Sequence, residues 1–284
     1  MFQNEVSRFG CVITGILGIG KTYFGLFLLY YIHLYHPKST ILWQLADSQF
    51  GECICFFPSG DVQIGHFNYF RSIIDKEDNF YLVDAQIPEG SSAYTILLTS
   101  PKPELFNRFI KPHSVTKYYM PIWEHDKLIV LWTACYKNIR NLKGKEFILE
   151  TIETLMGIWG PIPRSVLENW DDRSYNQKEF KKLINGTDLE KCMKSINEAG
   201  ITKNSASGRL VHIHVKPDFI NTHYQFASSL VCYKLINLYE LQLGNNLGDL
   251  ISCSDNHPKI ASYRGNLFEG LAHKQLSKGG IFRI

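Results

Sequence analysis

The first 115 residues carry a hydrophobic pattern in which short buried strands alternate with polar turns and a helix. Apolar, β-branched runs at 9–14, 80–84 and 94–101 are typical of strands buried in a sheet. Residues 23–34 are apolar on nearly every side, which predicts a helix packed between a sheet and other helices. Together these runs predict an α/β fold with a parallel sheet flanked by helices.

A hairpin is predicted within this region, after a further strand at 39–45. Residues 52–57 and 62–67 have strand composition and flank Pro58-Ser59-Gly60-Asp61, which is a strong turn signal. We therefore expect a β-hairpin insertion with a structural purpose.

Beyond residue 116 the pattern becomes mostly helical, with one exception. Residues 210–215 predict a strand that places His212 and His214 on one face. No acid or thiol accompanies these histidines, so a metal site there is not favoured. Apolar periodicity predicts helices at 123–136, 145–159, 177–184, 188–199, 224–243 and 261–273.

Composition adds few constraints. The chain has 284 residues, 45% apolar and 20% charged, which is ordinary for a globular protein, and its net charge of +3 is too small to indicate nucleic acid. Seven scattered cysteines suit reduced thiols, and Cys53-x-Cys55 lacks the second pair that a zinc site needs. Neither a secretory signal nor a membrane-spanning run is evident, and because a strand begins within ten residues of Met1 we expect a trimmed N-terminus.

Residues 15–22 fit the phosphate-binding loop pattern G-x-x-x-x-G-K-[ST], in the strand, loop, helix context that this pattern requires. Average residue usage would produce the pattern by chance in roughly one in a hundred chains of this length. Glycines let consecutive N–H groups converge on a β-phosphate at a helix N-terminus, Lys21 adds a mobile charge, and Thr22 offers a hydroxyl to Mg²⁺. A glycine-rich turn without a ligand is the alternative. The predicted nucleotide-binding residues are Gly15, Gly18, Ile19, Gly20, Lys21 and Thr22.

Asp84 ends the apolar run 80–84, which is the form of a Walker B strand. Its carboxylate is expected beside the phosphate loop, where it would hold Mg²⁺ together with Thr22. Many ATPases place a catalytic Glu directly after this Asp, but Ala85 follows here. Glu89 is the nearest acid and a weak candidate for a base, so we expect hydrolysis to be slow or absent.

Two further residues complete the predicted catalytic set with Asp84. Ser100 ends the strand 94–101 and could contact the γ-phosphate or its attacking water, although a Ser before a Pro is also a simple strand stop. Arg164 follows Pro163 at an expected helix start, where it could act as a second sensor of the bound nucleotide. An ordinary surface role for Arg164 stays open.

The order of motifs resembles the Crinkler effectors of oomycetes and fungi and the related retrotransposon hot spot proteins of trypanosomes. Single motifs are weak, but seven in this order are specific, and they span nearly the whole chain. The matching segments are Gly-Ile-Gly-Lys-Thr-Tyr-Phe (18–24), Tyr-Leu-Val-Asp (81–84), Thr-Ser-Pro (99–101), Tyr-Tyr-Met-Pro-Ile-Trp (118–123), Gly-Pro-Ile-Pro-Arg (160–164), Phe-Ala-Ser (226–228) and Arg-Gly-Asn-Leu-Phe-Glu (264–269).

This resemblance implies a P-loop ATPase module of the AAA+-like (STAND-like) class, followed by the start of a restriction-endonuclease-like domain whose first acid would be Glu269. It also implies secretion and action inside a host cell, often in its nucleus. The chain departs from the family in three ways: no targeting header precedes it, it stops at Ile284 before the metal-binding Asp and Glu-x-Lys, and Gly160-Pro161 replaces the usual Gly-Gly.

The expected functional unit is an ATP- and Mg²⁺-binding switch. The alternative is a DNA-targeting nuclease effector whose catalytic half is missing, with a host protein or DNA as partner; oligomerisation is also open. DNA cleavage by this chain is not expected, because residues 270–284 contain no Asp or Glu. The chain has no evident Arg-rich lid, which disfavours a small-molecule kinase. It also has no Asn-Lys-x-Asp motif, which disfavours a GTPase. The expected division is a P-loop core (1–115), a helical lid and sensor region (116–207), a connector (208–258) and a truncated nuclease start (259–284).

Overall fold

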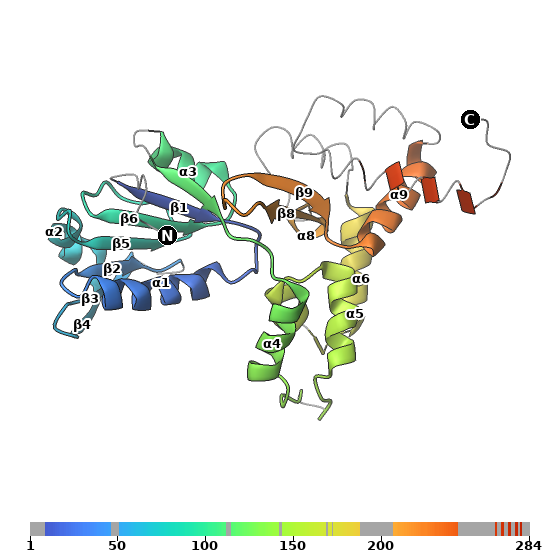
Figure 1. Ribbon diagram of the computed structural model, residues 1–284, viewed down its shortest axis with the longest axis horizontal. Coiled ribbons are helices and arrows are strands. Elements are labelled where there is room, and N and C mark those ends of the chain that lie inside the picture. Colours follow the sequence, from blue (N-terminus) through green and yellow to red (C-terminus); the bar gives the residue numbers. More distant parts are fainter. Residues whose placement is uncertain are drawn as a thin grey trace. The chain divides into compact units, whose positions relative to one another are not determined.

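The computed structural model describes residues 9–46, 51–111, 115–141, 144–168, 170–171, 173–187 and 207–243, with a few single positions between 265 and 279. The chain divides into two compact units (Figure 1). The first comprises residues 1–15 and 20–120, and the second comprises residues 16–19 and 121–284. Four residues in the middle of the predicted phosphate loop are thus counted with the second unit.

The first unit is built on a seven-stranded sheet with the order β4-β3-β2-β5-β6-β1-β7. β2, β5, β6, β1 and β7 run parallel, and β3 and β4 form an antiparallel hairpin at one edge. The predictions of a parallel α/β sheet and of a hairpin are therefore confirmed. The strands are β1 (Gly10–Thr14), β2 (Ile41–Gln44), β3 (Glu52–Phe56), β4 (Val62–His66), β5 (Phe80–Asp84), β6 (Tyr94–Thr99) and β7 (Thr116–Tyr119).

The parallel register brings the carboxyl ends of three strands together. Asp84 at the end of β5 lies opposite Leu98 of β6, and Thr99 at the end of β6 lies opposite Thr14 of β1. The predicted phosphate loop follows β1 at the same edge. In open parallel sheets this edge is where ligands bind.

The two faces of the sheet bury alternate residues of each strand, as the period of two requires. Val12, Val83 and Leu97 belong to one hydrophobic cluster, and Ile13 and Leu98 belong to the other. The connecting helices are α1 (Lys21–Tyr35), η1 (Phe67–Phe70), α2 (Arg71–Ile74) and α3 (Pro103–Ile110).

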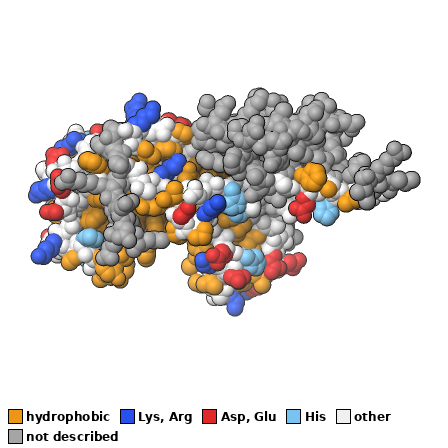
Figure 2. Space-filling model, turned by 45° about the horizontal axis from the view of Figure 1, so that its top comes forward, with side chains coloured by type: hydrophobic (Ala, Val, Ile, Leu, Met, Phe, Trp, Pro, Cys, Tyr) orange, Lys and Arg blue, Asp and Glu red, His pale blue; other side chains and the backbone are white. Residues whose placement is uncertain are grey.

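Helix α1 differs from its prediction, because it is not packed on nearly every side. It buries one stripe, formed by Gly25, Leu28 and Ile32, against the sheet. A Cβ on Gly25 would lie 2.6 Å from Leu98 Cδ1, which shows how closely the helix backbone approaches β6. The opposite side is apolar yet 48–79% exposed, at Tyr23, Leu26, Phe27, Tyr30 and Leu34. Figure 2 shows hydrophobic side chains at the surface of this unit.

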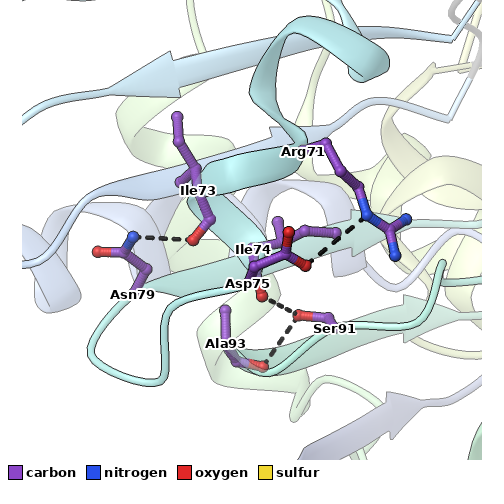
Figure 3. A network of polar contacts seen from close by, with 7 residues as sticks. All are labelled: Arg71, Ile73, Ile74, Asp75, Asn79, Ser91 and Ala93. Carbon is purple, nitrogen blue, oxygen red and sulfur yellow. Dashed lines mark hydrogen bonds and ion pairs between the residues drawn. The ribbon is translucent and has the colours of Figure 1, made fainter.

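A polar network fixes the other end of β5 and β6 (Figure 3). The buried side chain of Asn79 donates to the carbonyl of Ile73 at 2.8 Å and accepts from the Thr40 N–H at 3.0 Å. Ser91 Oγ bonds the carbonyls of Ile74 and Ala93 at 3.1 and 3.2 Å. These bonds pair backbone groups at the points where the chain enters the two strands, far along them from Asp84 and Thr99.

The second unit combines helices with a two-stranded hairpin. Its order is α4 (His125–Cys135), α5 (Leu149–Trp159), η2 (Arg164–Glu168), α6 (Arg173–Asn185), α8 (Ser207–Leu210), β8 (Val211–Val215), β9 (Thr222–Phe226) and α9 (Ser229–Leu243). α5 begins later than predicted, because Ile148 is extended and Glu146 forms a bridge with Arg140.

The predicted helix 224–243 is wrong at its start. Thr222–Phe226 is strand β9, which pairs antiparallel with β8, and the helix begins only at Ser229. Tyr224 and Phe226 are buried and alternate along the strand. Strand β8 needs a partner for its backbone groups, and pairing with β9 overrides the local helical pattern.

Aromatic rings hold the second unit together. Phe147 stacks on Trp170 with centroids 4.6 Å apart, and Trp132 meets Phe147 edge to face. Trp159 packs against Phe180 and lies under the guanidinium of Arg209 at 4.3 Å.

Some predictions lie outside the described residues. The helix at 188–199 is wholly outside them, and so is most of the segment 261–273. Glu269 is described and exposed, with its Oε1 3.7 Å from His273 Nε2. A membrane-crossing helix would need a longer apolar run than any described helix offers.

Candidate nucleotide-binding site

The glycines of the loop have backbone conformations that other residues rarely adopt. Gly18 has φ +84° and Gly20 has φ +99°, both in the left-handed region. Gly20 is the N-cap of α1, and its carbonyl accepts the Phe24 N–H at 2.9 Å. Ile16 and Ile19 are buried and anchor the loop by their side chains. The loop thus ends at the N-terminus of a long helix, which suits an anion.

Lys21 occupies the first turn of α1 and turns back over the loop. Its Nζ donates to the carbonyl of Gly15 at 2.9 Å. Both residues belong to the first unit. This position holds the ammonium group at the loop entrance, where a phosphate oxygen could take over the hydrogen bond.

Thr22 and Asp84 meet at the carboxyl end of the sheet. Thr22 Oγ1 donates to Asp84 Oδ2 at 2.8 Å, and Asp84 is only 5% exposed. The hydroxyl and the carboxylate are hard oxygen ligands, as Mg²⁺ requires. Within the described residues no three His, Cys, Asp or Glu side chains form a metal cluster. A magnesium ion that is shared with phosphates needs only one or two carboxylates, so this pair fits the ion.

The position after Asp84 carries no acid. Ala85 is exposed with φ +53°, and its N–H donates to the Leu98 carbonyl at 2.7 Å. Glu89, the nearest acid in sequence, lines a hollow with Phe9 and Thr95. Because these two residues lie at the starts of β1 and β6, the structure places Glu89 toward the opposite end of the strands from the loop.

Ser100 follows β6 and is partly exposed. The residue before it, Thr99, was missed by the sequence reasoning. Thr99 is 1% exposed, and its hydroxyl has no hydrogen-bond partner in the described part of the chain. The same is true of Thr14, its neighbour in register on β1. An unpaired buried hydroxyl costs about 1–3 kcal/mol, so these two groups are candidates for ligand contact.

Arg164 begins η2, which is a π-helix rather than the ordinary helix expected. Its backbone N–H donates to the carbonyl of Gly18 at 3.2 Å, within the second unit. A Cβ on Gly18 would lie 2.7 Å from Arg164 Cβ, so only glycine allows this approach. The Arg164 side chain forms an ion pair with Glu168, Nε to Oε2 at 3.3 Å, and both are about half exposed.

Trp123 is a further loop contact that sequence reasoning missed as a site residue. Its indole Nε1–H donates to the carbonyl of Ile19 at 2.9 Å, also within the second unit. The one sequence signal for it is its place at the end of the Tyr-Tyr-Met-Pro-Ile-Trp segment, 118–123.

No family model matches the chain, and no curated protein matches it. Among solved structures, the chain is similar to AMPPCP-bound DnaA from Aquifex aeolicus, with 12% identity and a TM-score of 0.35 over 98% of this chain and 86% of that one. At this TM-score the likeness decides neither fold nor function.

Proposed function

We propose that this chain is an ATP-binding P-loop NTPase module of the AAA+-like class that acts as a nucleotide-dependent switch with slow or absent hydrolysis. One observation carries the proposal. Thr22, from the loop sequence, bonds Asp84, from the end of β5, at 2.8 Å, while Lys21 lies over the loop at Gly15. A phosphate chain and its magnesium ion need this combination of cation, hydroxyl and carboxylate.

The sheet order supports the same assignment. β6 lies between β1, which leads into the loop, and β5, which ends in Asp84. The hydroxyls of Thr99 and Ser100 therefore follow a strand that is flanked by both halves of the site. Either hydroxyl is suitably placed in sequence and topology to sense the terminal phosphate or a water beside it.

Bound Mg²⁺ would supply charge neutralisation at the β- and γ-phosphates. Thr22 Oγ1 and Asp84 would hold it, and Lys21 would donate to the same phosphates. Ala85 cannot accept a proton from water, which supports slow or absent hydrolysis.

The switch is proposed to involve Arg164. Its backbone N–H bonds the Gly18 carbonyl of the loop, and its side chain is held by an exposed ion pair with Glu168. An exposed ion pair of this kind contributes about 0.3–0.5 kcal/mol, so it is easily exchanged for a contact with a phosphate. A γ-phosphate contact would thereby act on η2 and the helices that follow it.

The biological setting is a separate proposal that rests on the motif order alone. We propose that the module belongs to a Crinkler-like effector that acts in a host cell on a protein or DNA partner.

The nucleotide proposal is tested by calorimetry with ATP, ADP and GTP in Mg²⁺ on the parent and Lys21→Ala. Removing the mobile charge should weaken ATP binding at least tenfold, about 1.4 kcal/mol or more. Lys38→Ala, which changes an exposed lysine of the same unit, should leave the affinity unchanged. A parent without measurable affinity, or a Lys21→Ala variant with parental affinity, overturns the nucleotide site.

A further inference from the structure

Two consecutive carbonyls of the loop accept hydrogen bonds from donors that belong, like these carbonyls, to the second unit. The Gly18 carbonyl accepts the Arg164 N–H at 3.2 Å, and the Ile19 carbonyl accepts the Trp123 indole N–H at 2.9 Å. The side chain of Ile19 is fully buried, which also restrains this segment.

Peptide geometry turns these two bonds into a constraint on the loop's donors. In a planar trans peptide the C=O and the following N–H point in opposite directions. Fixing the Gly18 carbonyl therefore aims the Ile19 N–H away from Arg164, and fixing the Ile19 carbonyl aims the Gly20 N–H away from Trp123. These N–H groups belong to the sequence that a phosphate loop uses to cradle phosphates.

We infer that Trp123 is a positioning residue of the phosphate cradle, whose indole N–H orients the Ile19–Gly20 peptide so that its N–H faces a bound β-phosphate. The inference rests on the proposed nucleotide site. Trp123 itself does not contact the nucleotide.

Indole is suited to this role. Its N–H can only donate, so it specifies a carbonyl partner and cannot be satisfied by the peptide in the flipped orientation. Without it, the Ile19–Gly20 peptide can rotate, because Gly20 accepts either hand of backbone conformation. In a variant without this indole N–H, phosphate binding would have to order the Ile19–Gly20 peptide, which is already ordered in the parent. This ordering would lower the affinity of the variant for phosphate.

The chain offers a matched control. Trp132 lies in the same unit and is buried, but within the described residues its Nε1 has no hydrogen-bond partner. Trp132→Phe therefore makes the same chemical change as Trp123→Phe without removing a hydrogen bond.

The first test measures MgATP and MgADP affinity by calorimetry on the parent and both variants. Trp123→Phe should weaken both nucleotides by the same factor, about threefold to tenfold, as expected for one hydrogen bond. The ATP-to-ADP ratio should stay at the parental value, because the oriented N–H faces the β-phosphate that both share. Trp132→Phe should change neither affinity by more than about twofold.

The second test follows the indole N–H signals of the ¹⁵N-labelled parent by NMR, with Trp123 assigned from the Trp123→Phe spectrum or, if that variant does not fold, by backbone methods. Inorganic pyrophosphate, which presents phosphate groups without a base or sugar, should shift the Trp123 signal. An unmoved Trp123 signal in a parent that binds pyrophosphate overturns the positioning role.

The outcomes separate the two proposals. Parental affinity in Trp123→Phe, with a parent that binds nucleotide, overturns the role of Trp123 and leaves the nucleotide site standing. Equal weakening in both tryptophan variants assigns the effect to lost packing and also overturns it. A parent that binds neither nucleotide nor pyrophosphate overturns the nucleotide site and the positioning role with it.

Discussion

Thr22 Oγ1 and Asp84 Oδ2 are 2.8 Å apart, although 62 residues separate them in sequence. The hydroxyl comes from the first turn of α1, and the carboxylate comes from the carboxyl end of β5. Because Asp84 is buried, bulk water screens the charge of its carboxylate only weakly. This pair is the observation on which the proposed magnesium site rests.

Asp84→Asn should leave the metal-free affinity for ATP largely intact and abolish most of its enhancement by Mg²⁺. The amide keeps the shape of the side chain but removes the negative charge that a divalent ion requires. The measurement is ATP affinity with and without Mg²⁺. Asp78→Asn, an exposed change in the same unit, serves as the control. Unchanged Mg²⁺ dependence in Asp84→Asn would show that this carboxylate does not hold the ion.

Arg164→Ala should spare ADP affinity and reduce the preference for ATP over ADP. The variant keeps the backbone bond to Gly18, so any effect reports the side chain alone. Glu168→Gln is the complementary variant, since it releases the guanidinium from its ion pair and should preserve or raise the preference for ATP. If Arg164→Ala keeps the parental ATP-to-ADP ratio, Arg164 returns to being an ordinary surface residue.

Thr99→Val should stabilise the free protein and weaken ATP binding. Valine matches threonine in shape and removes a buried hydroxyl that lacks a partner, which contributes about 1 kcal/mol of stability in the absence of ligand. If the hydroxyl meets the γ-phosphate or its water, ATP affinity should fall about threefold or more while ADP affinity is unchanged. Ser100→Ala provides the comparison, because only one of the two hydroxyls is expected to show this ATP-specific loss. A stabilised Thr99→Val variant with parental ATP affinity would make Thr99 a purely structural residue.

The second unit should lose stability as the pH falls below about 6.5. Burial lowers the pKa of His212 to about 3 from an ordinary 6.5, with a smaller contribution from the charge of His214. Burial is also the larger cause of the lowered pKa of His214, which is about 4, and the charge of His223 is the smaller cause. At pH values between these folded pKa values and 6.5, the unfolded chain binds protons at these histidines that the folded chain does not bind. The unfolding free energy therefore decreases as the pH decreases, by up to about 1.4 kcal/mol per pH unit for each such histidine.

Urea unfolding between pH 7 and pH 5 measures this slope. His212→Gln should flatten the slope relative to the parent. The slopes are compared rather than the absolute stabilities, because glutamine also alters the packing around Gly160, where the His212 ring is close. An equal slope in His212→Gln and the parent would rule out His212 as the cause.

Much of the first unit could be predicted from local pattern. Continuous apolar runs identify β1, β5 and β6, and the Pro-Ser-Gly-Asp turn identifies the β3–β4 hairpin. The prediction failed where two local patterns compete. Residues 224–226 were predicted as the start of a helix, but they belong to strand β9, which pairs with β8.

The candidate site divides in the same way. The glycines, Lys21 and Thr22 were identifiable because a phosphate loop demands those residue types at short, fixed spacing, and Asp84 was identifiable because it ends an apolar strand run that follows the loop in sequence. Thr99 and Trp123 were not singled out as candidate site residues, although each lies in one of the quoted motifs, because the local pattern does not show which residue of a motif contacts the loop or a ligand.

The sequence by itself determined the chemical groups of the loop, the strands that carry them and the absence of an acid after Asp84, because each of these is a property of neighbouring residues. Only the tertiary structure decided that Thr22 meets Asp84, that Trp123 and Arg164 bond the loop carbonyls, and that just one stripe of α1 is buried. Hydrogen-bond partners and burial depend on residues that are distant in the chain. No local periodicity specifies which of them come into contact, so these relationships appear only once the chain is folded.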